Sequence, residues 1–364
     1  MYELHELRMR QALGVAKESL VRTAPNPRVG CAIYSQSGDL IAEGITAPPG
    51  GPHAEIQAIR AAREMGHDLR GTSVYVTLEP CAHTGRTGPC ADALIEAGVR
   101  EVFVGASDPN PLVGGLGIVR LKEAGVRVET GVLGRECQKQ HAPFFKWIRT
   151  GRPWVSLKGA MTLDGCLSTA NGDSQWITGE RARTHVHRLR AQVDGIMVGG
   201  ETARRDRPSL NVRLCEGSDP IAIALSRSLS VPNDAPFIRE GSLLFHSCDA
   251  PQVRIEQLSS RGATLIEVPL SDEGRGLNLE DILDELGRRE ITHLCVEGGG
   301  RLHGAFLSAG LADDIHLYIA PKIIGRGKPL FQLPSVSLIS EGYELSEIES
   351  EQIGEDLYLY GLLK

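Results

Sequence analysis

The sequence has 364 residues, with 39 lysines and arginines against 46 aspartates and glutamates, which gives a formal net charge of −7. This acidic balance, without a run of basic residues, argues against a nucleic-acid surface, and no apolar stretch approaches the length of a membrane span. The length exceeds what one hydrophobic core usually holds, so we expect two domains. The charged N-terminal segment lacks an apolar signal core, and the eight cysteines are scattered. Both features predict a cytoplasmic protein with reduced thiols.

The first half alternates between predicted helices and strands, which favours a layered α/β sheet. Apolar spacing predicts a helix over 4–20, and "HAEIQAIRAAREMG" predicts another that stops at Gly66. Further helices are expected at 90–98 and 117–125, and strands at 29–34, 40–45, 73–80, 99–106 and 126–132.

The second half opens with a new predicted strand that begins at Trp154. The preceding stretch "FFKWIRTGRPW" (144–154) is basic and contains Gly and Pro, and we interpret it as a linker between domains at 1–147 and 148–364. Strands are expected at 193–200, 220–226, 241–247, 264–269, 292–300, 314–324 and 356–363, with helices at 251–261, at 279–289 and from residue 301.

One histidine and two cysteines have the character of zinc ligands. His53 lies in "PHAE", and Cys81 and Cys90 each follow a proline in "EPCAHTGRTGPC" (79–90). Three protein ligands leave a fourth position for water, which is typical of a catalytic rather than a structural zinc site. His83 is a rival ligand, but we assign it to the substrate pocket. A structural zinc knuckle or simple buried thiols remain alternatives.

Glu55, two residues after His53, gives this cluster an acid/base group. Zinc lowers the pKa of a bound water, and a carboxylate beside it can take the water's proton and pass it to a leaving amine. The order H-x-E followed by Pro-Cys steps is the signature of zinc deaminases that act on bases, apart from the eight residues that separate the two cysteines here. We therefore predict a hydrolytic deaminase.

Across nearly the whole chain the sequence resembles the bifunctional deaminase–reductase family of riboflavin biosynthesis. The matching segments, in order, are "PNPRVGC", "PHAE", "EPCAHTGRTGPC", "DPNPLVGGLGI", "LKGAMTLDG", "GDSQWITG", "LRAQVD", "RPSLNVR", "VEGGG" and "YIAPKIIG". The resemblance implies a cytidine-deaminase-like three-layer α/β/α domain followed by a dihydrofolate-reductase-like α/β domain. It also implies zinc, NADPH, a small phosphorylated pyrimidine as substrate and a homo-oligomer, without nucleic acid or membrane.

The implied reaction has two steps. The first replaces an amino group of 2,5-diamino-6-(5-phosphoribosylamino)pyrimidin-4(3H)-one by oxygen, with Glu55 as the proton carrier. The second uses NADPH to reduce the ribosyl chain to ribityl. In the first pocket the resemblance implies that Asn26 holds the pyrimidine ring. It also implies that the insert between the two cysteines lines the substrate pocket, with His83 and Arg86 in contact with the substrate. Asn26-Pro27 is also typical of an ordinary turn.

The second half has two glycine-rich turns, "VGGET" (198–202) and "VEGGG" (296–300), each after a predicted strand. Such turns let backbone N–H groups approach the phosphates of a dinucleotide, although each is equally typical of a plain tight turn. The standard G-x-G-x-x-G fingerprint is absent. Arg227 is our own candidate for the 2′-phosphate of the cofactor, with a solvated surface arginine as the alternative.

The resemblance assigns further residues to the reductase pocket. On the cofactor side these are Ala160, Trp176, Thr202, Asp206, Ser226 and the segment Gly299–Ala305, which includes Gly300 and Arg301. On the substrate side they are Lys158, Ser174, Arg190, Leu210, Arg213 and Glu297, with Asp164 in the same pocket. We expect Arg190 and Arg213 to clamp the ribose phosphate, and Lys158 and Glu297 are candidate proton donors beside water.

The chain departs from the family pattern at three places, where it has Thr46, Arg207 and Leu225. Thr46 stands where the family often has a His that contacts the substrate, whereas Arg207 and Leu225 leave in place every group that we assign to chemistry. Three alternatives stay open: a zinc deaminase of another base, including bases in tRNA; a zinc-stabilised binding module without catalysis; and a chain in which one half is inactive.

Overall fold

The structure is a computed structural model that describes residues 2–82, 88–110, 114–272, 274 and 276–364. Its internal contacts divide the chain into two units, Met1–Gly151 and Arg152–Lys364, each with its own hydrophobic core. The boundary predicted from the sequence, 147/148, falls inside the last helix of the first unit. The two units are described separately.

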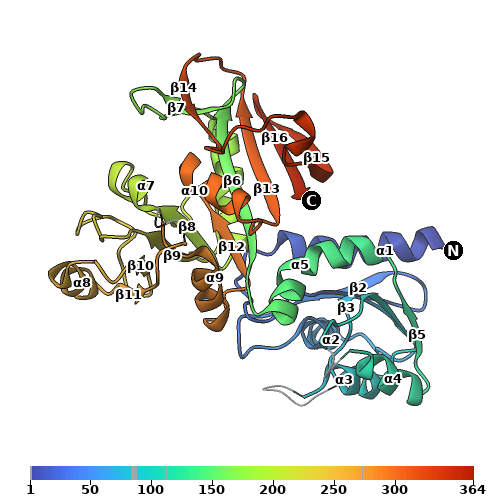
Figure 1. The fold of residues 1–364 in the computed structure, drawn as a ribbon. Coiled ribbons are helices and arrows are strands. Elements are labelled where there is room, and N and C mark those ends of the chain that lie inside the picture. Colours follow the sequence, from blue (N-terminus) through green and yellow to red (C-terminus); the bar gives the residue numbers. More distant parts are fainter. Residues whose placement is uncertain (1, 83–87, 111–113, 273, 275) are drawn as a thin grey trace. The chain divides into compact units, whose positions relative to one another are not determined.

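The first unit is a three-layer α/β/α domain around a five-stranded sheet of order β2-β1-β3-β4-β5 (Figure 1). β1 pairs antiparallel with β2 and β3, whereas β3, β4 and β5 run parallel. Helices α1 and α5 cover one face of the sheet, and α2, α3 and α4 cover the other. The strands are β1 (Gly30–Tyr34), β2 (Leu40–Ile45), β3 (Ser73–Leu78), β4 (Glu101–Ala106) and β5 (Arg127–Thr130), and the helices are α1 (Tyr2–Glu18), α2 (Ala54–Glu64), α3 (Cys90–Glu96), α4 (Leu116–Glu123) and α5 (Gly134–Thr150).

Every residue of β1, β3 and β4 is buried, because helices lie on both faces of these central strands. Their apolar side chains supply about 25 cal/mol of stabilisation for each Å² that folding removes from water. The carboxyl end of β3 leads directly into Glu79, Pro80 and Cys81. The buried sheet thus fixes the point from which the cysteine-bearing loop starts.

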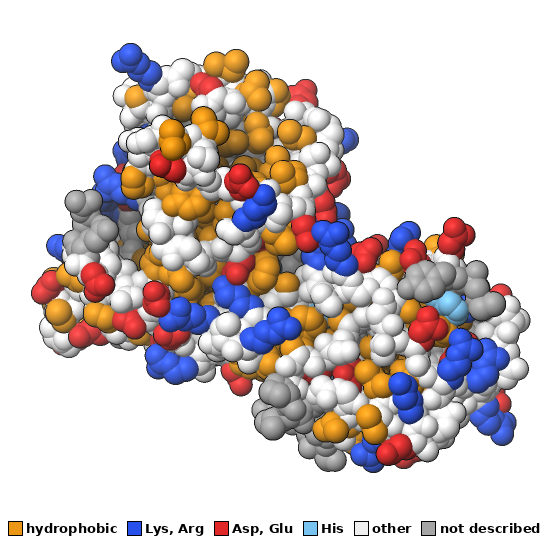
Figure 2. Space-filling model, turned by 45° about the vertical axis from the view of Figure 1, so that its right-hand side comes forward, with side chains coloured by type: hydrophobic (Ala, Val, Ile, Leu, Met, Phe, Trp, Pro, Cys, Tyr) orange, Lys and Arg blue, Asp and Glu red, His pale blue; other side chains and the backbone are white. Residues whose placement is uncertain are grey.

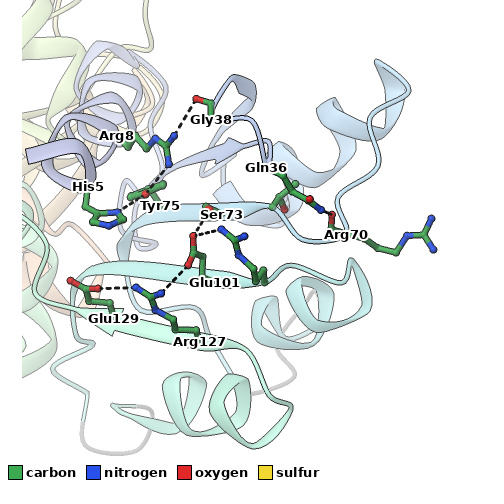
Figure 3. A network of polar contacts seen from close by, with 12 residues as sticks. His5, Arg8, Gln36, Gly38, Arg70, Ser73, Tyr75, Glu101, Arg127 and Glu129 are labelled. Carbon is green, nitrogen blue, oxygen red and sulfur yellow. Dashed lines mark hydrogen bonds and ion pairs between the residues drawn. The ribbon is translucent and has the colours of Figure 1, made fainter. Parts of the chain in front are cut away.

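An aromatic and polar cluster attaches α1 to the sheet (Figure 3). The Nδ1 atom of His5 lies 2.8 Å from the hydroxyl of Tyr75, and the Arg8 guanidinium lies 4.5 Å from the centre of the Tyr34 ring. Tyr75 stacks on Phe103 at 4.5 Å between ring centres. The buried Tyr75 hydroxyl therefore has partners from the helix that covers it, as a buried polar group requires.

The stretch that the sequence led us to interpret as a linker is largely helical. α5 runs from Gly134 to Thr150, includes Pro143, and ends at Gly151, whose φ of 73° lies in the left-handed region that favours glycine. Three residues of α5 are buried, so the helix packs as part of the first unit. The division between the two units, at Gly151/Arg152, lies inside this stretch, but the residues before it are helical, which the sequence interpretation overlooked.

The second unit contains a nine-stranded sheet of order β11-β10-β9-β8-β12-β6-β13-β16-β15. The seven strands from β11 to β13 in this order are parallel, and β16 and β15 extend the sheet as an antiparallel hairpin. Its strands are β6 (Trp154–Thr162), β8 (Gly195–Gly199), β9 (Ile221–Leu225), β10 (Leu243–His246), β11 (Thr264–Glu267), β12 (His293–Val296), β13 (Asp314–Ala320), β15 (Leu345–Ile353) and β16 (Asp356–Leu363).

Helices cover this sheet, and a separate strand pair lies beside it. The helices are α6 (Glu180–Gln192), α7 (Gly200–Arg205), α8 (Gln252–Ser259), α9 (Leu279–Arg288) and α10 (Gly300–Ser308), with a short 3₁₀ turn at Ile339–Glu341, and the separate pair is β7 (Cys166–Thr169) with β14 (Gly327–Pro329). The sequence analysis did not anticipate α6, α7, β7, β14 or β15. It did place β8, β9 and β12, which matter most for the site, because their buried apolar runs are continuous.

Among the residues that the structure describes, no helix is both long and apolar enough to cross a membrane.

Candidate active sites

The three predicted metal ligands come together in the first unit. The Nδ1 atom of His53 lies 3.6 Å from the Sγ atom of Cys81 and 3.3 Å from that of Cys90. All three ligand atoms lie within 4.8 Å of one another, and no other such cluster of His, Cys, Asp and Glu occurs among the described residues. His53 therefore lies beside two cysteines that follow it in the sequence by 28 and 37 positions.

Local structure explains the position of each ligand. His53 is the N-cap residue of α2, Cys90 is the first residue of α3, and Cys81 follows β3 through Glu79-Pro80. The backbone N–H of Cys90 points at the Cys81 sulfur, 3.4 Å away. Hydrogen bonding with Cys90 lowers the pKa of the Cys81 thiol. Free N–H groups at helix starts favour the thiolate form that binds metal.

Glu55 lies in the first turn of α2 and is only 4% exposed. Burial, together with the negative charge of Cys81, raises the pKa of its carboxyl group to about 7. A carboxyl group with this pKa exchanges a proton readily at neutral pH, which suits a general acid/base. The structure therefore brings the expected proton carrier to the three ligands.

The donor set fits zinc. Bond lengths of about 2.0 Å to nitrogen and 2.3 Å to sulfur, at tetrahedral angles, place N and S about 3.5 Å apart. The two N–S separations of 3.6 and 3.3 Å lie near this value. One imidazole and two thiolates leave the fourth position for water or substrate, which is the pattern of a catalytic zinc site.

Glu79 holds the cysteine-bearing loop in a way that the sequence analysis missed. Its carboxylate is 5% exposed and accepts backbone N–H bonds from Gly115 at 3.0 Å, Gly117 at 3.1 Å, Asp108 at 3.3 Å and Ile118 at 3.4 Å. These donors lie at and before the start of α4, where N–H groups are free. The available signal was an acidic residue after a buried strand, followed by the glycine-rich "VGGLG".

Gly117 permits this arrangement because of its small size. A Cβ atom at this position would lie 1.8 Å from the carbonyl oxygen of Pro80. Only glycine lets α4 approach the Pro80-Cys81 segment so closely. The glycine-rich stretch is thus part of the support of the metal-binding loop.

The predicted substrate contacts of the first unit are described only in part. His83 and Arg86 lie outside the described residues. Asn26 is half-buried, in the loop before β1, and its backbone N–H bonds to Thr23. Thr46, which departs from the family pattern, is buried, and its hydroxyl accepts the backbone N–H of Val29 at 3.1 Å. Thr46 therefore holds the strand that follows Asn26.

In the second unit Glu297 pairs with two cations. Its carboxylate receives bonds from Nε and Nη2 of Arg190, both at 2.8 Å, and lies 3.8 Å from the Nζ atom of Lys158. Burial alone would raise the pKa of Glu297, but the charges of Arg190 and Lys158 outweigh it and hold the pKa at about 2. Lys158 on β6 and Glu297 after β12 are neighbours because these strands pair in register.

Arg190 is held by two partners within the second unit. We expected it to clamp the ribose phosphate together with Arg213, yet its guanidinium is 11% exposed and binds Glu297, with Nη1 donating to the carbonyl of Asn211 at 3.1 Å. Arg213 is exposed, and its Nη1 donates to Asn211 Oδ1 at 3.3 Å. Of the two predicted phosphate ligands, Arg213 is the one whose charge faces solvent.

The predicted cofactor residues gather at the carboxyl ends of three neighbouring strands. Gly199 ends β8, Ser226 follows β9, and Glu297–Gly300 follows β12. A Cβ atom at Gly299 would lie 3.5 Å from the Oγ1 atom of Thr202, so the two glycine-rich turns are adjacent. In parallel sheets, ligands bind outside the carboxyl ends of the strands. The arrangement therefore suits a dinucleotide.

Trp176, which the resemblance assigns to the cofactor side, is 59% exposed. The guanidinium of Arg183 lies 4.6 Å from the centre of its ring, and Lys322 donates to the carbonyls of Trp176 and Ile177 at 2.7 and 2.8 Å. Ser174, in the same loop, is half-buried. Two cations therefore hold the loop that carries both predicted contacts.

The remaining predicted residues of the reductase pocket are spread over several elements. Ala160 packs against the cluster around Tyr318, and Asp206 caps the end of α7. Arg227 is exposed, and Arg301 lies 4.0 Å from Glu201.

Asp164 and Arg207 each bind neighbouring groups of the second unit. Asp164 accepts backbone N–H bonds from Ile324 and Gly325, so it fixes a turn. Arg207 forms an ion pair with Asp234 at 2.6 Å, which compensates its unexpected charge. Leu225, the third departure from the family pattern, ends β9.

Comparison with known proteins gives two matching families. The model of the cytidine and deoxycytidylate deaminase zinc-binding region matches residues 2–106, and the model of the RibD C-terminal domain matches residues 153–359. The riboflavin biosynthesis protein RibD of Actinobacillus pleuropneumoniae is 40% identical over 356 residues, which cover 96% of this chain and 93% of that protein. RibD of Escherichia coli is 36% identical over 371 residues, covering 98% of each.

Solved structures agree with these relatives. RibD of Acinetobacter baumannii, form 1, superposes with a TM-score of 0.87 at 34% identity and covers 100% of both chains. The diaminohydroxyphosphoribosylaminopyrimidine deaminase/5-amino-6-(5-phosphoribosylamino)uracil reductase of Thermotoga maritima gives a TM-score of 0.84 at 33% identity, covering 100% of this chain and 99% of that one. The fold class expected from the sequence is confirmed.

Proposed function

This chain belongs to the RibD family of bifunctional deaminase–reductases of riboflavin biosynthesis, and we propose that His53, Cys81 and Cys90 hold its zinc while Glu55 carries the proton. Its deaminase activity converts 2,5-diamino-6-(5-phosphoribosylamino)pyrimidin-4(3H)-one to the corresponding uracil. Its reductase activity then uses NADPH to turn the ribosyl chain into ribityl. The observation that carries the site assignment is the convergence of three ligand atoms within 4.8 Å beside the buried Glu55.

Glu55 has the position for both proton transfers of deamination. When bound, zinc supplies a water that is acidic at neutral pH. Beside such a water, Glu55 would act as the base that accepts a proton when the oxygen bonds to the amino-bearing ring carbon. It then returns the proton to the amino nitrogen, which leaves as ammonia. We assign Asn26, His83 and Arg86 to holding the substrate.

In the reductase unit we propose Lys158 as the proton donor. NADPH supplies the hydride to the carbonyl carbon of the opened ribosyl chain, and the carbonyl oxygen needs a proton. Glu297 does not suit this role, because Arg190 and Lys158 keep it ionised with a pKa of about 2. Lys158 carries three donor protons and lies 3.8 Å from Glu297, which orients it. Thr202, Ser226 and the Gly299–Ala305 segment, near the carboxyl ends of β8, β9 and β12, would hold the cofactor.

The first test is mass spectrometry of the products that the zinc-loaded protein makes from the diaminopyrimidinone ribosyl phosphate. Without NADPH we expect exchange of one amino group for oxygen, and with NADPH a further gain of two hydrogens. The Glu55→Gln variant should lose at least about 100-fold in deamination, because the amide does not accept the proton. It should keep its zinc content and its reductase activity.

Glu64→Gln is the matched control, since Glu64 ends the same helix and is exposed. Full deamination by Glu55→Gln would refute the assignment of the proton carrier. Deamination without reduction by the wild-type protein would leave the second unit as a degenerate domain. No deamination of this substrate would favour a deaminase of another base.

We further propose that the protein is a cytoplasmic homo-oligomer whose only partners are itself and small molecules. All eight cysteines are free, and thiolate ligands persist in a reducing compartment. In Figure 2 hydrophobic side chains gather on the upper part of the visible face. Exposed apolar residues of the second unit include Ile323, Leu338, Ile339 and Ile348. Such surfaces commonly mark subunit contacts, and light scattering of the purified protein would give the oligomeric state.

A further inference from the structure

The loop Ser209–Arg213, here the 209–213 loop, carries two residues that we assign to the reductase substrate, Leu210 and Arg213. Leu210 is 1% exposed and has a φ of 48°, in the left-handed region. A non-glycine residue in this region costs about 1 kcal/mol and persists only where its surroundings hold it. The loop has no regular secondary structure of its own, so side chains from elsewhere must provide that support.

Arg239 holds the first part of the loop from a segment about 30 residues farther along the chain. Its Nη1 donates to the carbonyl of Ser209 at 2.8 Å, and its Nη2 donates to the carbonyl of Leu210 at 3.2 Å. The same Nη2 atom lies 3.8 Å from the Oδ2 atom of Asp219. The guanidinium therefore bridges the strained residue and a nearby carboxylate.

Three further side chains hold the second part of the loop. Asp219 Oδ1 accepts the N–H of Val212 at 2.8 Å, and His187 Nδ1 accepts the N–H of Arg213 at 3.1 Å. Nη1 of Arg190 donates to the carbonyl of Asn211. Each of the five consecutive residues of the loop thus gives one backbone group to a side chain outside it, which leaves the loop little freedom.

His187 is suited to accept this bond. It is 3% exposed, on the same helix as Arg190 and three residues before it. Burial lowers the pKa of His187 to about 4, and the charges of Arg190 and Arg213 act in the same direction. The imidazole is therefore neutral at pH 7, and Nδ1 is free to accept the Arg213 N–H.

We propose that Arg239, Asp219 and His187 are positioning residues for the reductase reaction, which fix the 209–213 loop so that Leu210 and Arg213 meet the phosphorylated substrate. This inference rests on the reductase activity of the proposed function. The guanidinium of Arg190 binds Glu297 and Asn211, so Arg213 is the cation whose placement decides phosphate binding. A preformed loop binds substrate more tightly, because less ordering takes place on binding.

The kinetic test uses full-length Arg239→Met, with Arg239→Lys as the conservative variant and Arg288→Met as the control. Arg288 is an exposed arginine on α9 whose loss breaks an ion pair with Glu285 but leaves the loop intact. With 5-amino-6-(5-phosphoribosylamino)uracil and NADPH, Arg239→Met should raise the KM for the uracil about tenfold, equivalent to ~1.4 kcal/mol. Arg239→Lys should recover part of this, and Arg288→Met should match the wild type.

Two readouts separate positioning from general damage. The Kd of NADPH and the deaminase rate of the same preparation should stay at their wild-type values. An unchanged KM for the uracil in Arg239→Met would overturn the inference. An equal weakening of NADPH binding would also overturn it, because the effect would then not be confined to the substrate loop.

Amide hydrogen exchange gives a second test that needs no substrate. In Asp219→Ala and His187→Phe the amides of Val212 and Arg213 should exchange at least about tenfold faster, since each loses its acceptor. Peptides from β8 should exchange as in the wild type. Unchanged protection of the loop would overturn the inference even if Arg239→Met fails to fold. If the wild-type protein does not reduce the uracil, the proposed function fails, while exchange still decides whether the side chains hold the loop.

Discussion

Replacement of Glu79 by glutamine should selectively destabilise the deaminase unit. The carboxylate accepts four backbone N–H groups, two per oxygen, at 3.0 and 3.3 Å on Oε2 and at 3.1 and 3.4 Å on Oε1. Glutamine keeps one acceptor oxygen and turns an NH₂ group toward the other two donors. A hydrogen bond to a charged group contributes about 1.5–3 kcal/mol, and the two longer bonds contribute least. We therefore expect a loss of about 2–4 kcal/mol in the free energy of unfolding.

The assay is urea unfolding of the full-length protein, followed through release of zinc to a chromogenic chelator and through loss of deaminase activity. In thermal unfolding of a unit of this size, the same loss of free energy would lower Tm by roughly 5–15 °C. Reductase activity of the same sample serves as the internal control, because Glu79 lies in the first unit. An unchanged midpoint for zinc release in Glu79→Gln would refute the view that this carboxylate supports the metal-binding loop.

The remaining predictions concern a buried histidine and two contacts of the reductase. Burial lowers the pKa of His141 to about 4, below its unfolded value of about 6.5, so its contribution to stability is present above pH 6.5 and is lost as pH falls toward 4. The free energy of unfolding, measured in urea at several pH values across this range, should change by about 3 kcal/mol less in His141→Gln than in the wild type. An equal pH dependence in the two proteins would contradict this. Glu297→Gln leaves Arg190 buried and unpaired, and we expect a destabilisation of about 3–5 kcal/mol with loss of reduction but normal deamination. Lys322→Met should raise the KM for NADPH several-fold and change the emission of Trp176, whose carbonyl Lys322 binds; unchanged fluorescence would show that the contact does not hold the loop.

Local signals made much of the first unit predictable. The order of strands and helices follows from apolar periodicity, and His53, Glu55, Cys81 and Cys90 stand out because zinc chemistry restricts the residue types and the prolines mark the starts of turns. These residues lie close together in the structure because each is at the end or start of a regular element.

The parts that escaped prediction depend on contacts between distant residues. α6 is rich in charged and polar residues, so its apolar pattern is weak, although it supplies both His187 and Arg190. The pairing of Arg190 with Glu297 joins residues 107 positions apart, and the bond from Arg239 to Ser209 spans 30. No local pattern announces such partners. The family resemblance assigns Arg190 to the substrate side, and no local pattern shows the carboxylate of Glu297 with which it pairs.

The division of the chain between Gly151 and Arg152 has a consequence for the pathway in the cell. The proposed metal ligands and Glu55 belong to one unit, and Lys158, Arg190 and Glu297 belong to the other. A single polypeptide therefore delivers the two catalysts in a fixed ratio of one to one, whatever the level of expression. The balance between the two reactions then depends on the kinetic constants of the two sites and not on separate expression levels.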